Sequence, residues 1–318
     1  MGAVYEVIDP QLGRPVALKL LVKGRHEQIA SERFYREAEI LARLQHPNLV
    51  KVHRIGELPE GPYILEERVE GRPLDAVLEA GPLEPTQAAE LCRALADALV
   101  TVHAAGIVHR DLKPANVIIR SDGAPVLIDF GVARDTDAET LTKTGAMVGT
   151  LAYMSPEQVR RLEDAPPIDG QADVYALGLV LYEVLVGERL HQGAPLQVMA
   201  EILVTPAPSA RSKRPDLPLD LDALIQITLA KKPSERPSAA LLREELDHFL
   251  RGEPTESAAR LASERRARLS RAFGFAGLGL TLCAGLVAFV VRPSEDSAPT
   301  PPPRSQATSA NDEAAEEA

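Results

Sequence analysis

The sequence is poor in aromatic and sulfur-containing side chains. Its 318 residues include no tryptophan, six tyrosines, six phenylalanines and two cysteines, Cys92 and Cys283. Two cysteines so far apart support neither a disulfide framework nor a cysteine metal site. A basic excess is also missing, because the formal net charge is −11, and this argues against nucleic acid as the main partner. No positively charged, cleavable apolar segment opens the chain, so we expect its N-terminal region to stay in the cytoplasm.

Two short elements carry the chemistry that is present. Residues 109–116 read His-Arg-Asp-Leu-Lys-Pro-Ala-Asn, and Asp129-Phe130-Gly131 follows an apolar run. Moving a phosphoryl group onto a hydroxyl needs a base beside the hydroxyl and cations on the phosphate oxygens. Asp111 is the candidate base, and Lys113 could neutralise charge that develops on the transferred phosphate. Asn116 and Asp129 offer hard oxygen ligands to a magnesium ion carried by a nucleotide.

These elements match the catalytic loop and the Asp-Phe-Gly element of protein kinases without substitution. With Lys113-Pro114 in the loop, the chain resembles the bacterial eukaryotic-like (Hanks-type) serine/threonine protein kinases, from Gly2 to about Leu250. The resemblance implies ATP and Mg²⁺ as cofactors, with Mn²⁺ as an alternative. It also implies an α+β fold of two lobes, with a small β-rich N-lobe and a larger, mostly α C-lobe.

The hydrophobic pattern agrees with that organisation. β-rich stretches cover residues 3–8, 15–22, 50–55 and 63–65, and helical spacing covers 29–45. From Thr86 the pattern is helical, with later helices expected at 174–186, 195–203, 220–229 and 239–250. We therefore expect a kinase domain over residues 1–251, with its N-lobe at 1–66 and its C-lobe at 70–251.

The resemblance assigns several nucleotide-binding residues in the N-lobe. It identifies Lys19 as the phosphate anchor and predicts an ion pair between Lys19 and Glu37 that keeps the lysine against the phosphates. The adenine ring should lie between the side chains of Val4, Ala17 and Ile118, and the backbone of Glu67 and Val69 should hydrogen-bond its edge.

The glycine-rich phosphate loop is the main departure from the family. Only Gly2-Ala3-Val4 of its pattern is present, so two glycines and the first strand are missing. Met1 is either an internal codon taken as the start or the result of a true truncation.

A second departure is Glu66 at the back of the pocket, where relatives usually carry an apolar side chain. A buried unpaired carboxylate is costly, so Glu66 should be protonated, paired with a base such as Lys19, or turned to water. If Glu66 captures Lys19 from Glu37, the resting site should be inactive.

The resemblance also names residues that support the site. The segment from Gly149 to Glu157, which contains Thr150, matches the family's peptide-positioning segment, and Glu157 should pair with Arg236. Asp173 matches the acid that ties the catalytic loop to the large lobe. Thr142 and Thr144 are candidate self-phosphorylation sites. Arg110 matches the arginine that binds the loop phosphate in this family.

The C-terminal part has a different character. A basic juxtamembrane linker is expected at 252–271, and residues 272–291 carry no charge. Since about 20 apolar residues suffice to cross a membrane, we interpret 272–291 as a transmembrane helix. The arginines before it place residues 1–271 in the cytoplasm, with an extracytoplasmic disordered tail at 292–318. The small residues Gly277, Thr281 and Gly285 share one helix face and could support a homodimer.

The main interpretation is therefore a membrane-anchored kinase that phosphorylates serine or threonine on cytoplasmic proteins and on itself. A pseudokinase or nucleotide-binding scaffold is the alternative, because of the incomplete loop and Glu66, although Asp111, Asn116 and Asp129 are intact. A small-molecule kinase is a third interpretation, against which the peptide-positioning segment argues.

Overall fold

The computed structural model describes residues 3–10, 13–20, 27–131, 148–160 and 168–263. The chain divides into two units, Met1–Ser263 and Glu264–Ala318, and all described residues belong to the first. Gly2, Thr142, Thr144 and the segment 272–291 lie outside the described residues. Among the described residues, no helix combines the length and the apolar composition that crossing a membrane requires.

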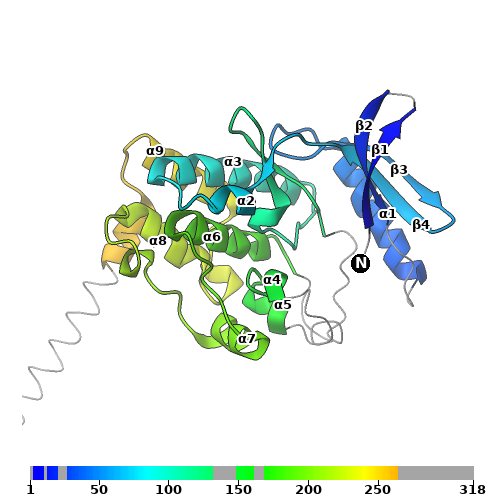
Figure 1. The fold of residues 1–318 in the computed structure, drawn as a ribbon. Helices are drawn as coiled ribbons and strands as arrows, with labels where there is room; N and C mark the ends of the chain where they lie inside the picture. Colours follow the sequence, from blue (N-terminus) through cyan, green and yellow to red (C-terminus); the bar gives the residue numbers. More distant parts are fainter. Residues whose placement is uncertain (1–2, 11–12, 21–26, 132–147, 161–167, 264–318) are drawn as a thin grey trace, which may run out of the picture. The chain divides into compact units, whose positions relative to one another are not determined.

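The N-terminal lobe is a four-stranded antiparallel sheet with one helix. Its strands are β1 (Ala3–Asp9), β2 (Arg14–Leu20), β3 (Val52–Leu58) and β4 (Gly61–Glu67), and their order is β1-β2-β4-β3. Helix α1 (Glu27–Arg43) packs against β3 and lies alongside the sheet in Figure 1. The sheet buries Val16, Val52 and Ile64, and Val52 and Ile64 belong to an apolar cluster that continues into the C-terminal lobe.

Strand β3 begins two residues later than the apolar pattern predicts. Val50 donates its backbone N–H to Leu127 at 3.0 Å, and Leu49 forms an isolated parallel bridge with the same residue. Leu127 belongs to β7 (Pro125–Leu127), which lies in a second sheet. The apolar character of residues 49 and 50 therefore reflects pairing with the other lobe.

The C-terminal lobe is mostly helical. Its three-stranded sheet runs β5-β6-β7, with β5 at Arg72–Pro73 and β6 at Val117–Ile119. The longer helices are α3 (Pro85–Ala104), α6 (Gln171–Val186), α7 (Pro195–Val204), α8 (Leu219–Thr228) and α9 (Ala239–Leu250). The short helices are α2 (Leu74–Leu78), α4 (Val148–Leu151) and α5 (Pro156–Arg160). Helix α3 packs against α6 and α9, and α6 packs against α8, as Figure 1 shows.

Local sequence explains where the central helices begin and end. Glu84 and Gln87 form a reciprocal capping box at the start of α3, and Pro85 occupies its first turn. Helix α6 ends at Gly187, whose φ of 84° is a left-handed conformation that glycine adopts without strain. Nearly every side chain of α6 is buried, which makes it the central helix of the lobe.

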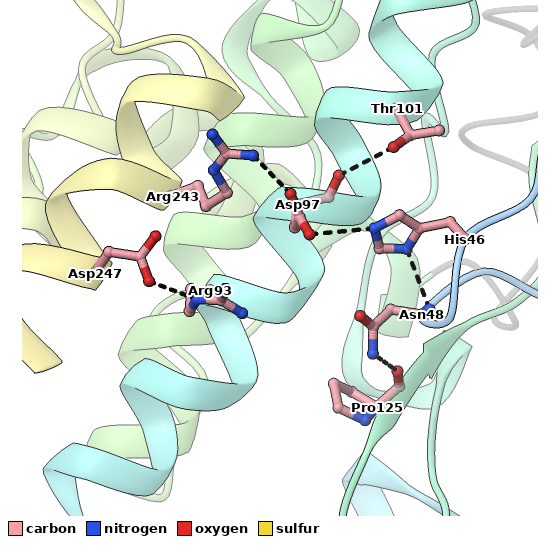
Figure 2. A network of polar contacts seen from close by, with 8 residues as sticks. All are labelled: His46, Asn48, Arg93, Asp97, Thr101, Pro125, Arg243 and Asp247. Atoms are coloured by element: carbon pink, nitrogen blue, oxygen red, sulfur yellow. Dashed lines mark hydrogen bonds and ion pairs between the residues drawn. The ribbon is translucent and has the colours of Figure 1, made fainter.

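A polar network fixes the connection that follows α1 (Figure 2). Asn48 donates its backbone N–H to Nδ1 of His46, so Nε2 of His46 carries the proton donated to Asp97 Oδ2 at 3.3 Å. Arg243 of α9 donates to the other oxygen of Asp97 at 2.7 Å. Asn48 also donates its side-chain amide to the backbone oxygen of Pro125 at 2.7 Å. The connection after α1 is thus joined to α3 by the contact of His46 with Asp97 and, through Asp97, to Arg243 of α9.

Candidate active site

Asp173, in the first turn of α6, organises the catalytic loop. It is 1% exposed, and its carboxylate accepts the backbone N–H groups of His109 and Arg110, each at 2.8 Å. His103 at the end of α3 donates Nε2 to the same carboxylate at 2.8 Å. Three donors on one buried carboxylate form a charge-assisted network, so the expected link between Asp173 and the loop backbone is present.

His109 is a buried, neutral part of the loop. Its Nε2 lies 3.0 Å from the backbone oxygen of Ile128, and its Nδ1 accepts the N–H of Asp111 at 3.3 Å. Because a carbonyl can only accept, the proton resides on Nε2. Burial lowers the pKa of His109 below its ordinary value. Its ring packs against Phe130 with centroids 4.7 Å apart, which connects the catalytic loop to the Asp-Phe-Gly element.

The candidate base Asp111 has fixed neighbours. Oδ2 of Asp111 accepts a hydrogen bond from Lys113 Nζ at 3.0 Å and another from Asn116 Nδ2, also at 3.0 Å. Lys113 also donates to Thr150 Oγ1 at 3.1 Å, which links the loop to the candidate peptide-positioning segment. The structure therefore brings together four residues that the sequence assigned to catalysis, metal binding and substrate positioning.

Two residues of the site have left-handed backbone conformations. The φ of Arg110 is 63° and that of Asp129 is 62°, and among the described residues these are the non-glycine positions with positive φ. Such conformations are sterically unfavourable for residues with a Cβ and persist where the surroundings impose them. Both lie at the candidate site, which is where stored backbone strain concentrates in proteins.

Lys19 and Glu66 are in contact because of the strand register. The β2–β4 pairing sets Glu66 opposite Ala17 and Ile64 opposite Lys19, so Lys19 and Glu66 are diagonal neighbours on one face of the sheet. Lys19 Nζ lies 2.5 Å from Glu66 Oε2 and 2.6 Å from Asp129 Oδ1. Of the three environments expected for Glu66, pairing with Lys19 is the one observed.

The expected ion pair between Lys19 and Glu37 is absent among the described residues, so that prediction is wrong for this structure. Instead, Glu37 Oε1 lies 3.6 Å from Arg110 Nη1. The physical reason is competition, because Glu66 and Asp129 are both within hydrogen-bond distance of the ammonium and their two negative charges already exceed its single positive charge. Glu37 forms its ion pair with Arg110 in place of Lys19.

Burial and charge shift the pKa values of this cluster in a consistent way. Burial alone would lower the pKa of Lys19, but the Glu66 and Asp129 carboxylates outweigh it and raise that pKa above its ordinary value. Burial raises the pKa of Glu66, although the Lys19 ammonium opposes that effect. The interaction of Lys19 with both carboxylates therefore strongly favours its charged form.

The candidate adenine-binding residues come from both lobes. Val4 on β1 is 60% exposed, while Ala17 on β2 and Ile118 on β6 are partly buried. Glu67 ends β4, and Val69 follows in the connection to β5. The side chain of Glu67 accepts a hydrogen bond from Arg120 at 3.4 Å, and its backbone N–H is donated to the backbone oxygen of Lys51 at 2.8 Å, so its backbone oxygen is the candidate for contact with adenine.

The donor set at Asn116 and Asp129 fits a hard divalent cation. Asn116 is 5% exposed, and it donates Nδ2 to the backbone oxygen of Asp111 at 2.7 Å, which leaves its amide oxygen to face a cation. Asp129 contributes a carboxylate. No cluster of three or more metal-binding side chains occurs in the described part of the chain, and a cation here would complete its coordination with phosphates and water, as Mg²⁺ commonly does.

The ion pair between Glu157 and Arg236 is present as expected. Arg236 donates Nη1 and Nη2 to the two carboxylate oxygens at 2.6 and 2.8 Å, a bidentate arrangement. Nε of Arg236 donates to the backbone oxygen of Ala230 and Nη1 also donates to that of Gln171, each at 2.8 Å. The guanidinium also lies 4.8 Å from the ring centre of Tyr175, so the pair fixes the start of α5 against α6.

Sequence reasoning did not find two contacts that support the loop. Gln158 of α5 donates to the backbone oxygen of Arg110 at 3.0 Å, and His103 joins Asp173. Both residues are polar and lie on helices with apolar faces, where nothing in the pattern distinguishes them from solvated side chains. Their roles follow from tertiary packing alone.

Comparison with known proteins agrees with this geometry. A model of the protein kinase domain matches residues 1–248. The chain belongs to the protein kinase domain family. It is 39% identical over 253 residues to a probable serine/threonine-protein kinase of Corynebacterium efficiens. The aligned region covers 76% of this chain and 38% of the relative. It is also 39% identical over 238 residues to the serine/threonine-protein kinase PknE of Mycobacterium tuberculosis, covering 74% of this chain and 41% of that protein. The chain thus spans about two fifths of the length of these relatives.

Solved structures show the same two-lobed kinase fold. The kinase domain of Mycobacterium tuberculosis PknI is similar with a TM-score of 0.61 and 30% identity, covering 78% of this chain and 91% of that domain. Rad53 residues 1–466 in complex with AMP-PNP is similar with a TM-score of 0.62 and 26% identity, covering 78% of this chain and 61% of that one. The fold of the described lobes is therefore that of a protein kinase, with a β-sheet N-lobe and a helical C-lobe.

Proposed function

We propose that this chain is an active serine/threonine protein kinase that transfers the γ-phosphate of ATP to hydroxyls of cytoplasmic proteins. The observation that carries the proposal is the contact of Lys113 with both Asp111 and Thr150. It joins the candidate base, a cation for the phosphate and the peptide-positioning segment. The activity of the relatives, which carry serine/threonine-protein kinase in their names, supports the same assignment.

Each residue has a distinct task in this proposal. Asp111 accepts the proton of the substrate hydroxyl as its oxygen bonds to the γ-phosphorus and the bond from that phosphorus to the bridging oxygen breaks, which releases ADP. Lys113 stabilises negative charge on the phosphate oxygens. Asn116 and Asp129 would hold Mg²⁺, or Mn²⁺ in its place, and the ion would neutralise charge on the β- and γ-phosphates. Asp173 keeps the loop backbone, and therefore Asp111, in position.

The proposal includes self-phosphorylation and a membrane anchor. Thr142 and Thr144 lie between Asp129 and Glu157, where a phosphate could reach Arg110. Residues 272–291 form an uncharged run of membrane-spanning length preceded by arginines. We infer that residues 272–291 anchor the chain in the inner membrane, with the kinase domain in the cytoplasm and residues 292–318 on the other side. The small residues at 277, 281 and 285 could pair two copies.

The experiment that tests the activity is transfer of labelled γ-phosphate from Mg-ATP to the full chain and to an added serine- and threonine-containing protein. Asp111→Asn is the matched control, because it removes the base but keeps the side-chain size. Label on Thr142 or Thr144 that is lost in the control would establish both activity and self-phosphorylation. Absence of transfer from the wild-type chain would contradict the proposal.

A nucleotide-binding scaffold without transferase activity is the second candidate. The contact of Lys19 with Glu66 favours it, because a lysine held by a buried carboxylate is not free to anchor phosphates. Nucleotide binding without transfer, both in the wild-type chain and in Glu66→Met, would support the scaffold. Recovery of activity in Glu66→Met would instead indicate a restrained kinase.

Partitioning tests the membrane anchor. The full chain should sediment with membranes and be released by detergent but not by high salt. The same chain lacking residues 272–318 should remain in the supernatant. Identical partitioning of the two proteins would contradict the anchor.

A further inference from the structure

We propose that Glu66 is a specificity-determining residue of the nucleotide site. Its ion pair with Lys19 makes nucleotide affinity depend strongly on a divalent cation. The inference rests on the proposed function only in requiring that a nucleotide binds at Lys19. It adds a property that phosphoryl transfer does not require, namely discrimination between metal-bound and metal-free nucleotide.

The first step is the position of Glu66 in the sheet. Strand register sets Glu66 beside Lys19 on the same face, and the two side chains approach to 2.5 Å. Glu66 is 4% exposed, so moving Lys19 away would leave a buried carboxylate without its ion-pair partner. The contact therefore follows from the pairing of β2 with β4.

The second step is the local charge. Lys19 contributes one positive charge, while Glu66 and Asp129, both in contact with it, contribute two negative charges. The cluster is thus negative by one charge before any phosphate arrives. An apolar side chain at position 66 would leave the same cluster neutral, so the excess charge comes from Glu66.

The third step is competition for the lysine. A metal-free nucleotide that uses Lys19 must compete with a buried carboxylate whose ion-pair partner, within the described residues, is Lys19. Removing one partner of a buried pair leaves an uncompensated charge, which is strongly unfavourable. Polyphosphate also meets the like charges of Glu66 and Asp129, and like charges placed together reduce affinity.

The fourth step is the effect of a cation. A divalent ion held by Asp129 and the phosphates would cancel part of the phosphate charge and would add an attraction to Asp129. It therefore offsets the repulsion from Glu66 for the metal-bound nucleotide but not for the metal-free one. The ratio of the two dissociation constants should be large in the wild-type chain and smaller when Glu66 is neutral.

Calorimetric titration of the full chain with ADP and with AMP-PNP tests this inference, in excess Mg²⁺ and in EDTA. Glu66→Gln removes the charge and keeps the shape, and Glu66→Met provides a second neutral side chain. Glu70→Gln is the matched control, because Glu70 lies four residues away and its side chain is 85% exposed. Thermal unfolding establishes that each variant is folded before titration.

We expect Glu66→Gln and Glu66→Met to tighten metal-free binding by about tenfold and Mg²⁺-bound binding by clearly less, since one buried like charge affects affinity on this scale. Glu70→Gln should retain the wild-type ratio. An unchanged ratio in both Glu66 variants, or an equal change in Glu70→Gln, would overturn the inference. Phosphate transfer is measured separately, so loss of transfer with a changed ratio would count against the kinase activity and leave the role of Glu66 in place.

Discussion

Arg110 and Glu37 form an ion pair across the two lobes, with Nη1 3.6 Å from Oε1 and both side chains 17% exposed. Arg110 belongs to the catalytic loop and Glu37 to α1. The residue that the family resemblance assigns to a loop phosphate is therefore engaged with the acid assigned to Lys19. This exchange of partners connects helix α1 to the catalytic loop.

The first prediction is that a loop phosphate weakens the Arg110–Glu37 pair. A phosphate carries about two negative charges and accepts several hydrogen bonds from a guanidinium, so it should compete well with one carboxylate. A double-mutant cycle of Arg110→Gln and Glu37→Gln should give a coupling of about 0.5–1 kcal/mol in unphosphorylated protein. In protein phosphorylated at Thr142 or Thr144, the coupling should fall to about zero. Urea unfolding of the four proteins in each state measures it. Equal coupling in both states would show that the phosphate does not reach Arg110.

The second prediction concerns Asp173, whose carboxylate accepts hydrogen bonds from His109, Arg110 and His103. In Asp173→Asn one acceptor becomes an N–H₂ group that faces a donor, so a buried hydrogen bond is lost. We expect the free energy of unfolding to fall by about 1–3 kcal/mol. The turnover number should fall further, because the backbone of the loop that carries Asp111 loses its attachment.

His103→Phe is the graded control for this change, because it keeps a planar ring but removes one of the three donors and leaves the two backbone contacts. It should cost less stability and less activity than Asp173→Asn. Urea unfolding and initial rates measure the two effects. An Asp173→Asn protein with unchanged turnover would mean that the loop holds its conformation without this carboxylate.

The third prediction concerns Arg236, whose side chain is fully buried and bidentate with Glu157. Arg236→Lys keeps the charge but cannot donate to both carboxylate oxygens and two backbone oxygens. Because a partly broken buried pair is strongly destabilising, we expect a loss of about 3 kcal/mol in the free energy of unfolding. The exposed pair of Lys232 and Glu235 is the control, and Lys232→Ala should change stability by less than about 0.5 kcal/mol. Similar losses in the two variants would contradict a special role for Arg236.

Particular residues show how far the sequence could predict this site. A local signature identifies Asp111, Lys113, Asn116 and Asp129. In the structure Lys113 and Asn116 both contact Asp111. Asp173 and the Glu157–Arg236 pair are distant in sequence, and they were predicted only because the family resemblance supplies the partner. The spacing of these residues in the sequence does not predict their contacts.

The partner of Lys19 could not be predicted in the same way. Lys19 is near several acids, and the choice between Glu66 and Glu37 depends on where α1 lies against the sheet. No periodicity in the sequence encodes that position. The pairing of Val50 with Leu127 was missed for a related reason, since an apolar strand pattern does not say which sheet the strand joins.

The last prediction is a pH dependence of stability that arises from Lys231. This residue donates Nζ to the backbone oxygen of Ile202 at 2.8 Å. Burial, with the nearby Arg236 and Arg160 guanidinium groups, lowers the pKa of Lys231 to about 8. In the unfolded chain the pKa of a lysine is about 10.4. Between these values the unfolded chain binds more protons than the folded chain, so this residue makes stability increase as the pH rises.

Lys231→Met removes that titration, and the stability difference between wild type and variant should therefore shift in favour of wild type from about pH 7.5 to pH 9.5. Lys213→Met is the control, because Lys213 is exposed and its hydrogen bond and ion pair with Glu188 raise its pKa. Its folded and unfolded forms are both protonated over this range, so the difference between wild type and Lys213→Met should stay flat. Urea midpoints at the two pH values measure both differences. A flat difference for Lys231→Met would show that the folded chain keeps Lys231 charged, with Arg236 and Arg160 too well screened to affect it.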